Sequence, residues 1–197
     1  PGDLFRDVRL ANEGLMWQCF NSRRFLLLTG FPSSFWRKYC PFLISDVRKI
    51  MQEKCDLWIF PDQVTWSYIL PVRSLSVIHD LMHRYENRFP EVSGFLTYRQ
   101  REKHYKDVCL YSEGILVDSD VGKAHVLESY KIDEKIIHVL PYVAPLYLDK
   151  EKSHLNTLQY DLPPKFFFYP AQFWKHKNHE ILIRAIESVL HKIPDMK

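Results

Sequence analysis

The stretch LPPKFFFYPAQFWKHKNHEILIRAI, residues 162–186, is the starting point for interpreting the rest of the chain. After a proline pair it has a short apolar run at 166–169. This run is too short for a helix and rich in aromatic residues, so it predicts a buried central strand. A cationic turn follows, and Asn178 stands where it can cap a helix whose apolar residues recur at helical spacing. This succession of strand, cationic turn and helix N-terminus is the one in which α/β proteins hold phosphate.

The turn carries Lys175, His176 and Lys177 where a diphosphate would meet the helix. A solvated turn before an ordinary helix would have the same residues, and the stretch alone slightly favours that plainer reading. The rest of the chain has to decide between the two.

The composition is that of a globular chain with a well-filled core. Of the 197 residues, 46% are hydrophobic and 15% are aromatic, which argues against disorder. The formal net charge of +3 is too small and too evenly spread for a nucleic-acid surface. It allows at most a weak peripheral contact with acidic lipid head groups. No apolar run is long enough to cross a bilayer, and the first residues do not have the pattern of a signal peptide, so we expect none.

The four cysteines are widely scattered and have no metal-ligand spacing: Cys19, Cys40, Cys55 and Cys109. They predict reduced thiols and hence a cytoplasmic protein, with a peripheral position at the inner face of the membrane left open. The chain begins Pro-Gly-Asp without an initiator methionine and stops soon after a helix, so we expect it to be a piece of a longer protein.

Short apolar strands alternate with helices along the chain. This alternation predicts βαβ units and a Rossmann-like α/β fold, in which helices flank a parallel sheet. Besides the strand and helix within 162–186, we expect strands at 25–28, 56–60, 75–78, 114–117 and 135–140, and helices at 4–20, 46–54, 97–112 and 121–130.

Polar residues recur at the carboxyl ends of the predicted strands, where ligands lie in parallel sheets. His79 and Asp80 follow one strand, and Asp118 and Ser119 follow the next. Between 141 and 164 the pattern lapses into turn residues, which predicts a linker before a new unit.

Two segments of the first part of the chain resemble the retaining, nucleotide-sugar-dependent glycosyltransferases of GT-B fold, the "glycosyl transferases group 1" type. The run SVIHDL at 76–81, with Phe89-Pro90 beyond it, is similar to a strand end of that family. The run GILVDSDVGK at 114–123, followed by KIIHVLP at 135–141, resembles its strand ending in serine and its next strand closed by proline.

A third segment, FYPAQFWKHKN at 168–178, resembles the start of the family's second Rossmann domain. The resemblance covers about residue 56 to the C-terminus and implies two Rossmann-like domains facing across a cleft. It divides the chain into a partial acceptor-side domain at 1–143, a linker at 144–162 and the first βα unit of the donor-binding domain at 163–197.

The resemblance implies transfer of a hexose from a nucleotide diphosphate sugar to a glycan or lipid-linked acceptor, with retention of configuration. It implies no cofactor beyond the donor substrate and no bound metal. His176 and His179 have a spacing that could bind metal, but no third ligand lies near them in the sequence. With so little of a donor domain, the chain is expected to be inactive alone.

The resemblance also assigns roles on the acceptor side. His79 matches the family's histidine beside the reacting sugar, which implies a catalytic role; a histidine satisfied by a neighbouring carbonyl is the plainer alternative. Asp80 is expected at the substrate site, fixing its loop or orienting His79. Ser119 is expected to bind acceptor or phosphate, with an N-cap for the following helix as an equal alternative.

On the donor side, Lys177 matches a lysine that clamps the donor diphosphate, where positive charge stabilises the leaving group. Gln172 stands where the family usually has an arginine. An amide can hydrogen-bond phosphate but brings no charge, so Lys175 or His176 would have to supply it.

Two departures from the family put activity in question. The family's glycine-rich loop is not seen in a chain with 6 glycines, and Glu180 and Glu187 are seven apart, unlike its glutamate pair spaced eight apart. One rival is a non-catalytic Rossmann-like binding or scaffold domain of a glycan-assembly system, which the loss of the arginine favours. The other is a GT-B-fold nucleotide-sugar epimerase, which would need carboxylates flanking the sugar.

Overall fold

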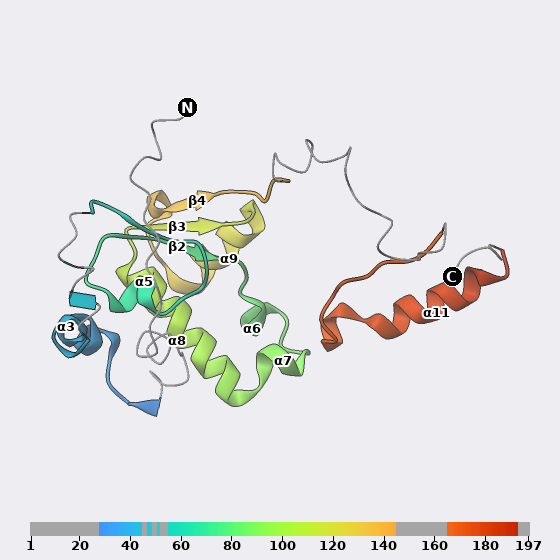
Figure 1. The fold of residues 1–197 in the computed structure, drawn as a ribbon, viewed down its shortest axis with the longest axis horizontal. Helices are drawn as coiled ribbons and strands as arrows, with labels where there is room; N and C mark the ends of the chain where they lie inside the picture. Colours follow the sequence, from blue (N-terminus) through green and yellow to red (C-terminus); the bar gives the residue numbers. More distant parts are fainter. Residues whose placement is uncertain (1–27, 45–46, 49–50, 52–54, 145–164, 193–197) are drawn as a thin grey trace, which may run out of the picture.

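The fold is built on one parallel sheet. A computed structural model describes residues 28–44, 47–48, 51, 55–144 and 165–192 (Figure 1). Four strands pair in the order β1-β2-β3-β4, all parallel. They are β1 (Trp58–Phe60), β2 (Ser74–Ile78), β3 (Gly114–Val117) and β4 (Ile137–Val139). The predicted parallel sheet is confirmed, with β1 and β4 shorter than the sequence indicated.

The helices between the strands include those predicted and several that were not. Described helices are α3 (Ser33–Leu43), α5 (Trp66–Ile69), α6 (Met82–Tyr85), α7 (Pro90–Ser93), α8 (Phe95–Tyr111), α9 (Asp120–Tyr130) and α11 (His179–Leu190), with 3-10 turns η1 (Glu134–Ile136) and η3 (Lys175–Lys177). The predicted helices near 97–112 and 121–130 are confirmed as α8 and α9. Of the predicted helix at 46–54, the described residues Val47, Arg48 and Met51 are helical.

Two predictions near the start of the chain fall wholly or largely outside the described residues. These are the helix at 4–20 and the strand at 25–28. Of the latter only Leu28 is described, and it is helical and exposed.

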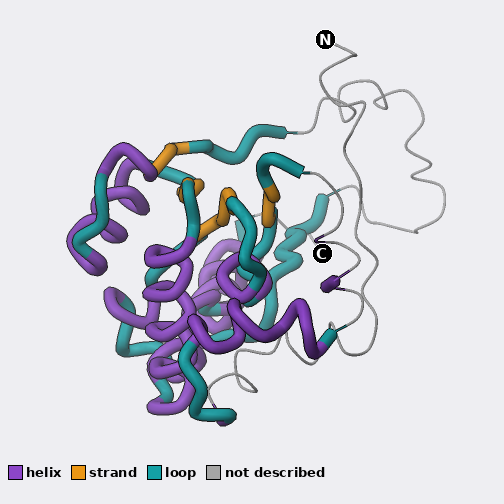
Figure 2. Tube along the Cα trace, turned by 90° about the vertical axis from the view of Figure 1, so that its left-hand side faces the viewer, coloured by secondary structure: helices purple, strands orange, loops and turns teal. Residues whose placement is uncertain are grey.

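The helices gather on one side of the sheet. Sequential strand order with right-handed crossovers places successive helices on the same face. Accordingly α5 and α8 contact β2, and α9 contacts β3 and β4. Figure 1 shows α5 and α8 on one side of the strands, and Figure 2 shows the short strands side by side with most of the helices below them.

The strand register places one row of residues of the sheet on the side of the helices. Phe60, Ser76, Ile115 and Ile137 form one row across the four strands, because each pairs with the next. All four are buried against the helices. Residues one position away point to the opposite face. On that face Ile59 is 63% exposed and His138 is exposed.

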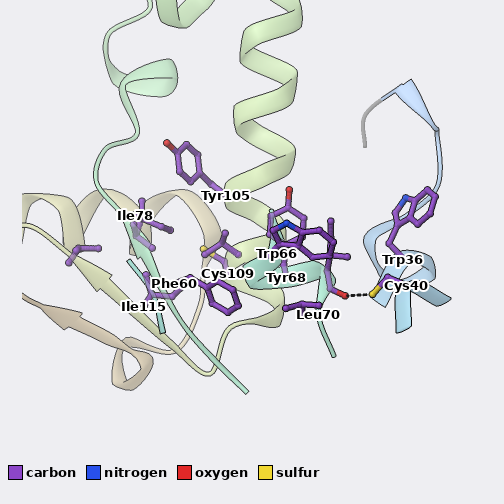
Figure 3. Close-up of a cluster of buried hydrophobic side chains, with 14 of the residues drawn as sticks. Trp36, Cys40, Phe60, Trp66, Tyr68, Leu70, Ile78, Tyr105, Cys109 and Ile115 are labelled. Carbon is purple, nitrogen blue, oxygen red and sulfur yellow. Dashed lines mark hydrogen bonds between the residues drawn. The ribbon is translucent and has the colours of Figure 1, made fainter. Parts of the chain in front are cut away.

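The core lies between the sheet and the helices α3, α5 and α8 (Figure 3). Trp66 and Tyr68 of α5 are 1% and 2% exposed, and Tyr105 of α8 is 0% exposed. Burial of each side chain of this size stabilises the fold by roughly 1.5–3 kcal/mol. The Cys40 thiol of α3 donates to the carbonyl oxygen of Ile69, 3.4 Å away, which ties α3 to α5.

Helix α3 was not predicted, because prolines bracket its sequence. Pro32 precedes its first residue and Pro41 lies in its last turn. A proline lacks the N–H that a helix interior needs, but it is tolerated near a helix end. The Arg37 guanidinium fixes α3 against α5 by donating to the carbonyl oxygens of Tyr68 and Leu70.

The predicted buried strand at 166–169 is wrong. These residues have no regular secondary structure, and Phe168 is 78% exposed. A strand forms only against a neighbour that satisfies its backbone, and within 55–144 and 165–192 no strand pairs with this run. The helix after it is confirmed as α11, which lies apart from the sheet in Figure 1. Its predicted cap is confirmed too, since the Ile181 N–H donates to Oδ1 of Asn178 at 3.3 Å.

Candidate functional site

Three polar side chains lie together at the carboxyl ends of three neighbouring strands. His79 follows β2, Asp118 follows β3, and Tyr142 lies just beyond β4. The His79 Nδ1 atom is 3.3 Å from the Asp118 Oδ1 atom and 2.8 Å from the Tyr142 hydroxyl oxygen. The rings of His79 and Tyr142 also stack, with centroids 5.9 Å apart. We call these three residues the His79 cluster.

The register of the sheet brings the His79 cluster together. Ile78 pairs with Val117, and Val117 pairs with Val139, so the residues after these positions meet at one edge. The Leu140 N–H donates to the Val117 carbonyl at 2.8 Å, which keeps the chain beyond β4 beside β3. Carboxyl ends of parallel strands are where ligands bind in open α/β sheets. The His79 cluster therefore lies at the edge of the sheet where ligands bind in proteins of this fold class.

A pocket of about 210 Å³ opens beside His79. Its wall includes the apolar side chains of Met82 and Val121. The polar residues on it include His79, Asp80, Glu86, Ser119 and His125. Tyr85 and His125, which also line the pocket, stack with ring centroids 3.7 Å apart and planes 12° apart. A mixed wall with a few convergent polar groups is typical of a small-molecule site.

Asp80 organises the loop after β2 and makes no described hydrogen bond to His79. Its Oδ1 atom accepts from the Met82 N–H at 2.9 Å and pairs with the Arg101 guanidinium at 2.5 Å. Of the two supporting roles expected for Asp80, the loop-fixing role is the one its contacts match. The carboxylate beside His79 is that of Asp118.

Ser119 caps α9. Its hydroxyl oxygen accepts from the Gly122 N–H at 3.1 Å, as the alternative reading of the sequence expected. The side chain still lines the pocket, and the residue is exposed. Because a capping hydroxyl uses only its oxygen lone pair, its proton is free to be donated to a ligand.

A buried polar network supports the loop behind the site. The Glu102 carboxylate accepts hydrogen bonds from Arg84, and the Nε2 atom of the fully buried His83 lies 3.1 Å from it. The Tyr130 hydroxyl is 3.4 Å from the same carboxylate. Burial raises the pKa of Glu102, but the bonds from Arg84 and His83 outweigh it and hold that pKa below its ordinary value. Burial lowers the pKa of His83.

Neither a function for Asp118 and Tyr142 nor the Glu102 network was predicted from the sequence. For Asp118 a signal existed, because it follows its strand just as His79 follows the neighbouring one. Tyr142 carried no such signal, since it lies beyond a proline in a segment with the composition of a linker. The network joins α6 to α8 across eighteen residues, which no local pattern reveals.

The residues predicted to bind the donor phosphate lie on the last described segment, 165–192. Gln172, Lys175 and Lys177 are exposed, and η3 carries both lysines just before α11. His176 is instead held by Glu91 of α7. The Glu91 Oε1 atom accepts from the His176 backbone N–H at 3.0 Å and lies 2.7 Å from its Nδ1 atom. A phosphate would compete with this carboxylate for His176.

A second pocket, of about 370 Å³, lies where residues 55–144 and 165–192 meet. Phe89 lines it from the first of these ranges, and Phe173, Trp174 and Lys175 line it from the second. His179 also lines it and is already occupied, since its Nε2 atom lies 3.3 Å from the Ala171 carbonyl oxygen. In the described part of the chain no group of three or more His, Cys, Asp or Glu side chains could hold a metal ion.

Comparison of the chain with protein families, with curated proteins and with solved structures finds no match. The class of protein therefore rests on the fold itself: a Rossmann-like α/β protein with a parallel sheet flanked by helices. Among the residues that the structure describes, no helix is long and apolar enough to cross a membrane.

Proposed function

We propose that this chain is part of a retaining sugar transferase of GT-B type, in which it forms the acceptor side of the catalytic cleft and the beginning of the donor side. The reaction moves a hexose from a nucleotide diphosphate sugar to a hydroxyl of a glycan or lipid-linked acceptor in the cytoplasm. The observation that carries the proposal is the His79 cluster, at the carboxyl ends of three parallel strands and beside a pocket of about 210 Å³.

Several groups that this chemistry uses support the proposal. The bond between the anomeric carbon and the diphosphate oxygen breaks, and the acceptor oxygen bonds to that carbon. The acceptor proton passes to the departing diphosphate. Cations near a departing diphosphate stabilise the charge that develops there. Lys175 and Lys177 are exposed beside the N-terminus of α11 and can take this role, while His79 binds the acceptor or the transferred sugar.

Specific observations also favour a second function, a non-catalytic binding domain. Gln172 brings no charge, and His176 is engaged by Glu91, so two of the four residues proposed for the donor phosphate offer little or no free positive charge. A domain that binds a nucleotide sugar or a glycan without transferring it would need only the pockets.

Transfer and binding can be tested together. The intact protein is incubated with nucleotide diphosphate hexoses and with glycan or lipid-linked acceptors, and products are identified by mass spectrometry and anomeric NMR. Binding of each nucleotide is measured in parallel by calorimetry. Transfer with retained configuration supports the transferase, and binding without transfer supports the binding domain. Neither transfer nor binding would overturn both.

A further inference from the structure

We infer that Asp118 is the positioning residue of His79: its carboxylate selects the tautomer that carries the proton on Nδ1, which leaves Nε2 as the hydrogen-bond acceptor for a ligand hydroxyl. The assignment of Nε2 to a sugar hydroxyl rests on the proposed function. The choice of tautomer rests on the geometry alone.

Two groups face the same ring nitrogen. The Nδ1 atom lies 2.8 Å from the Tyr142 hydroxyl oxygen and 3.3 Å from the Asp118 Oδ1 atom. If Nδ1 carried no proton, the tyrosine could donate to it, but its lone pair would then face a carboxylate oxygen. Two acceptors facing each other repel, and the negative charge of Asp118 strengthens the repulsion.

The other tautomer removes this repulsion. With a proton on Nδ1, the ring donates towards both oxygens. A carboxylate can only accept, whereas a phenol hydroxyl can accept as well as donate. Loss of water around the hydroxyl, followed by the charges of Asp118 and Asp62, raises the pKa of Tyr142, so the phenol stays neutral. The carboxylate therefore decides the tautomer, although the tyrosine is the closer partner.

Partial burial strengthens the effect of Asp118 on the tautomer of His79. The side chains of His79 and Asp118 are 31% and 26% exposed, so water screens their interaction less than it would on an open surface. Each is fixed to the end of a strand, and the two strands are in register at Ile78 and Val117. Both partners thus occupy the Nδ1 side of the ring, and Nε2 is the nitrogen that His79 can offer in the pocket it lines.

The tautomer can be read directly by NMR. In protein labelled with ¹⁵N-histidine, long-range ¹H–¹⁵N correlations show which ring nitrogen of His79 carries the proton. We expect a protonated Nδ1 in the wild-type protein at pH 8, with the exposed His138 as an internal reference. A wild-type spectrum with the proton on Nε2 would overturn the inference without any need for a variant.

Two variants separate the roles of the neighbours. We expect Asp118→Ala to move the His79 proton towards Nε2 and Tyr142→Phe to leave it on Nδ1. The backbone amide spectrum serves as the control for folding. An unchanged tautomer in folded Asp118→Ala, or a switch in Tyr142→Phe, contradicts the inference.

Failure of the proposed function and failure of the tautomer assignment would give different experimental results. If transfer occurs, Asp118→Ala should lower kcat by about 10- to 100-fold, at or below the lower end of what a positioned polar group contributes, with nucleotide binding unchanged. A protein with Nδ1 protonated and no transfer loses the transferase assignment and keeps the tautomer. A protein that transfers sugar with Nε2 protonated loses the tautomer and keeps the transferase.

Discussion

The Oε1 atom of Glu91 accepts a hydrogen bond from the backbone N–H of His176 at 3.0 Å and lies 2.7 Å from the Nδ1 atom of the same residue. The Glu91 side chain is 16% exposed and that of His176 is 12% exposed. Their contact joins α7 to η3 across 85 residues of sequence. This contact connects the segment that carries Lys175 and Lys177 to the sheet domain.

We expect Glu91→Gln to loosen this connection, because the amide removes the charge that both donors face. Hydrogen exchange of the His176 amide should accelerate. Glu180→Gln is the matched control, since Glu180 pairs with Arg184 within α11 and is 74% exposed. Equal exchange in wild type and Glu91→Gln would show that the contact does not hold the segment.

The same contact should weaken in acid. The backbone hydrogen bond from His176 is the largest of the effects that hold the pKa of Glu91 below its ordinary value. Burial opposes it, and the His176 side chain adds to it. A carboxyl with a lowered pKa in the folded state contributes stability above its unfolded pKa of about 4.3, and loses it as the pH falls through the folded value. Exchange of the His176 amide, corrected for its intrinsic rate, should therefore rise below about pH 4.

Glu102→Ala should lower the free energy of unfolding by about 1–3 kcal/mol, because Arg84 and the buried His83 lose their acceptor. Urea unfolding followed by circular dichroism measures the change. The control is Glu113→Ala, which breaks an exposed pair with Arg73 and should have little effect. Similar losses in the two variants would mean that the Glu102 network adds no more than a surface pair.

The cysteines should differ in reactivity. Burial raises the pKa of Cys40 and of Cys109 to about 12, whereas Cys55 is exposed. At pH 8 only about one buried thiol in 10⁴ is then a thiolate, the reactive form. We expect iodoacetamide to label Cys55 before Cys40 and Cys109, as measured by peptide mass spectrometry, and the difference among these three to vanish in denaturant. Rapid labelling of Cys40 in the folded protein would contradict its place in the core.

His79→Ala in the intact protein should lower sugar transfer by about 10²–10⁴-fold, the range for a positioned polar catalytic group. Nucleotide binding should persist, because the proposed donor-binding lysines lie on the other segment. The control is His138→Ala, which removes an exposed histidine from the face of the sheet that points away from the helices. Equal loss of binding and transfer in His79→Ala would indicate a role in folding instead.

Lys177→Ala should lower turnover by about 10²–10³-fold, because it removes a charge that stabilises the leaving diphosphate. The comparison is Lys192→Ala, an exposed lysine just beyond the far end of α11. Steady-state kinetics with saturating donor separate the effect on kcat from that on KM. Unchanged kinetics would exclude Lys177 from the donor site.

Local sequence was enough to predict the parallel sheet, but not the contacts of His79 at the end of it. Strand β3 was predicted to the residue, because Gly114 and Asp118 bound a purely apolar run. The run at 166–169 looks just as apolar, yet whether it becomes a strand depends on a neighbour that its own residues do not specify. The contact of His79 with Asp118 depends in the same way on register, which is set only when the strands pair.

The residues of the His79 cluster follow three successive strands, β2, β3 and β4. Binding of a ligand to the cluster therefore requires that these strands are paired. A slip of one residue in β3 would turn Asp118 to the opposite face, and a detached β4 would carry Tyr142 away. A partly folded chain therefore has no such cluster to offer. By linkage, a ligand that needs all three residues binds only when β2, β3 and β4 are paired, and it raises the free energy of unfolding of that arrangement by RT ln(1 + [L]/Kd). A thermal shift with a candidate ligand would then report on the pairing of these three strands.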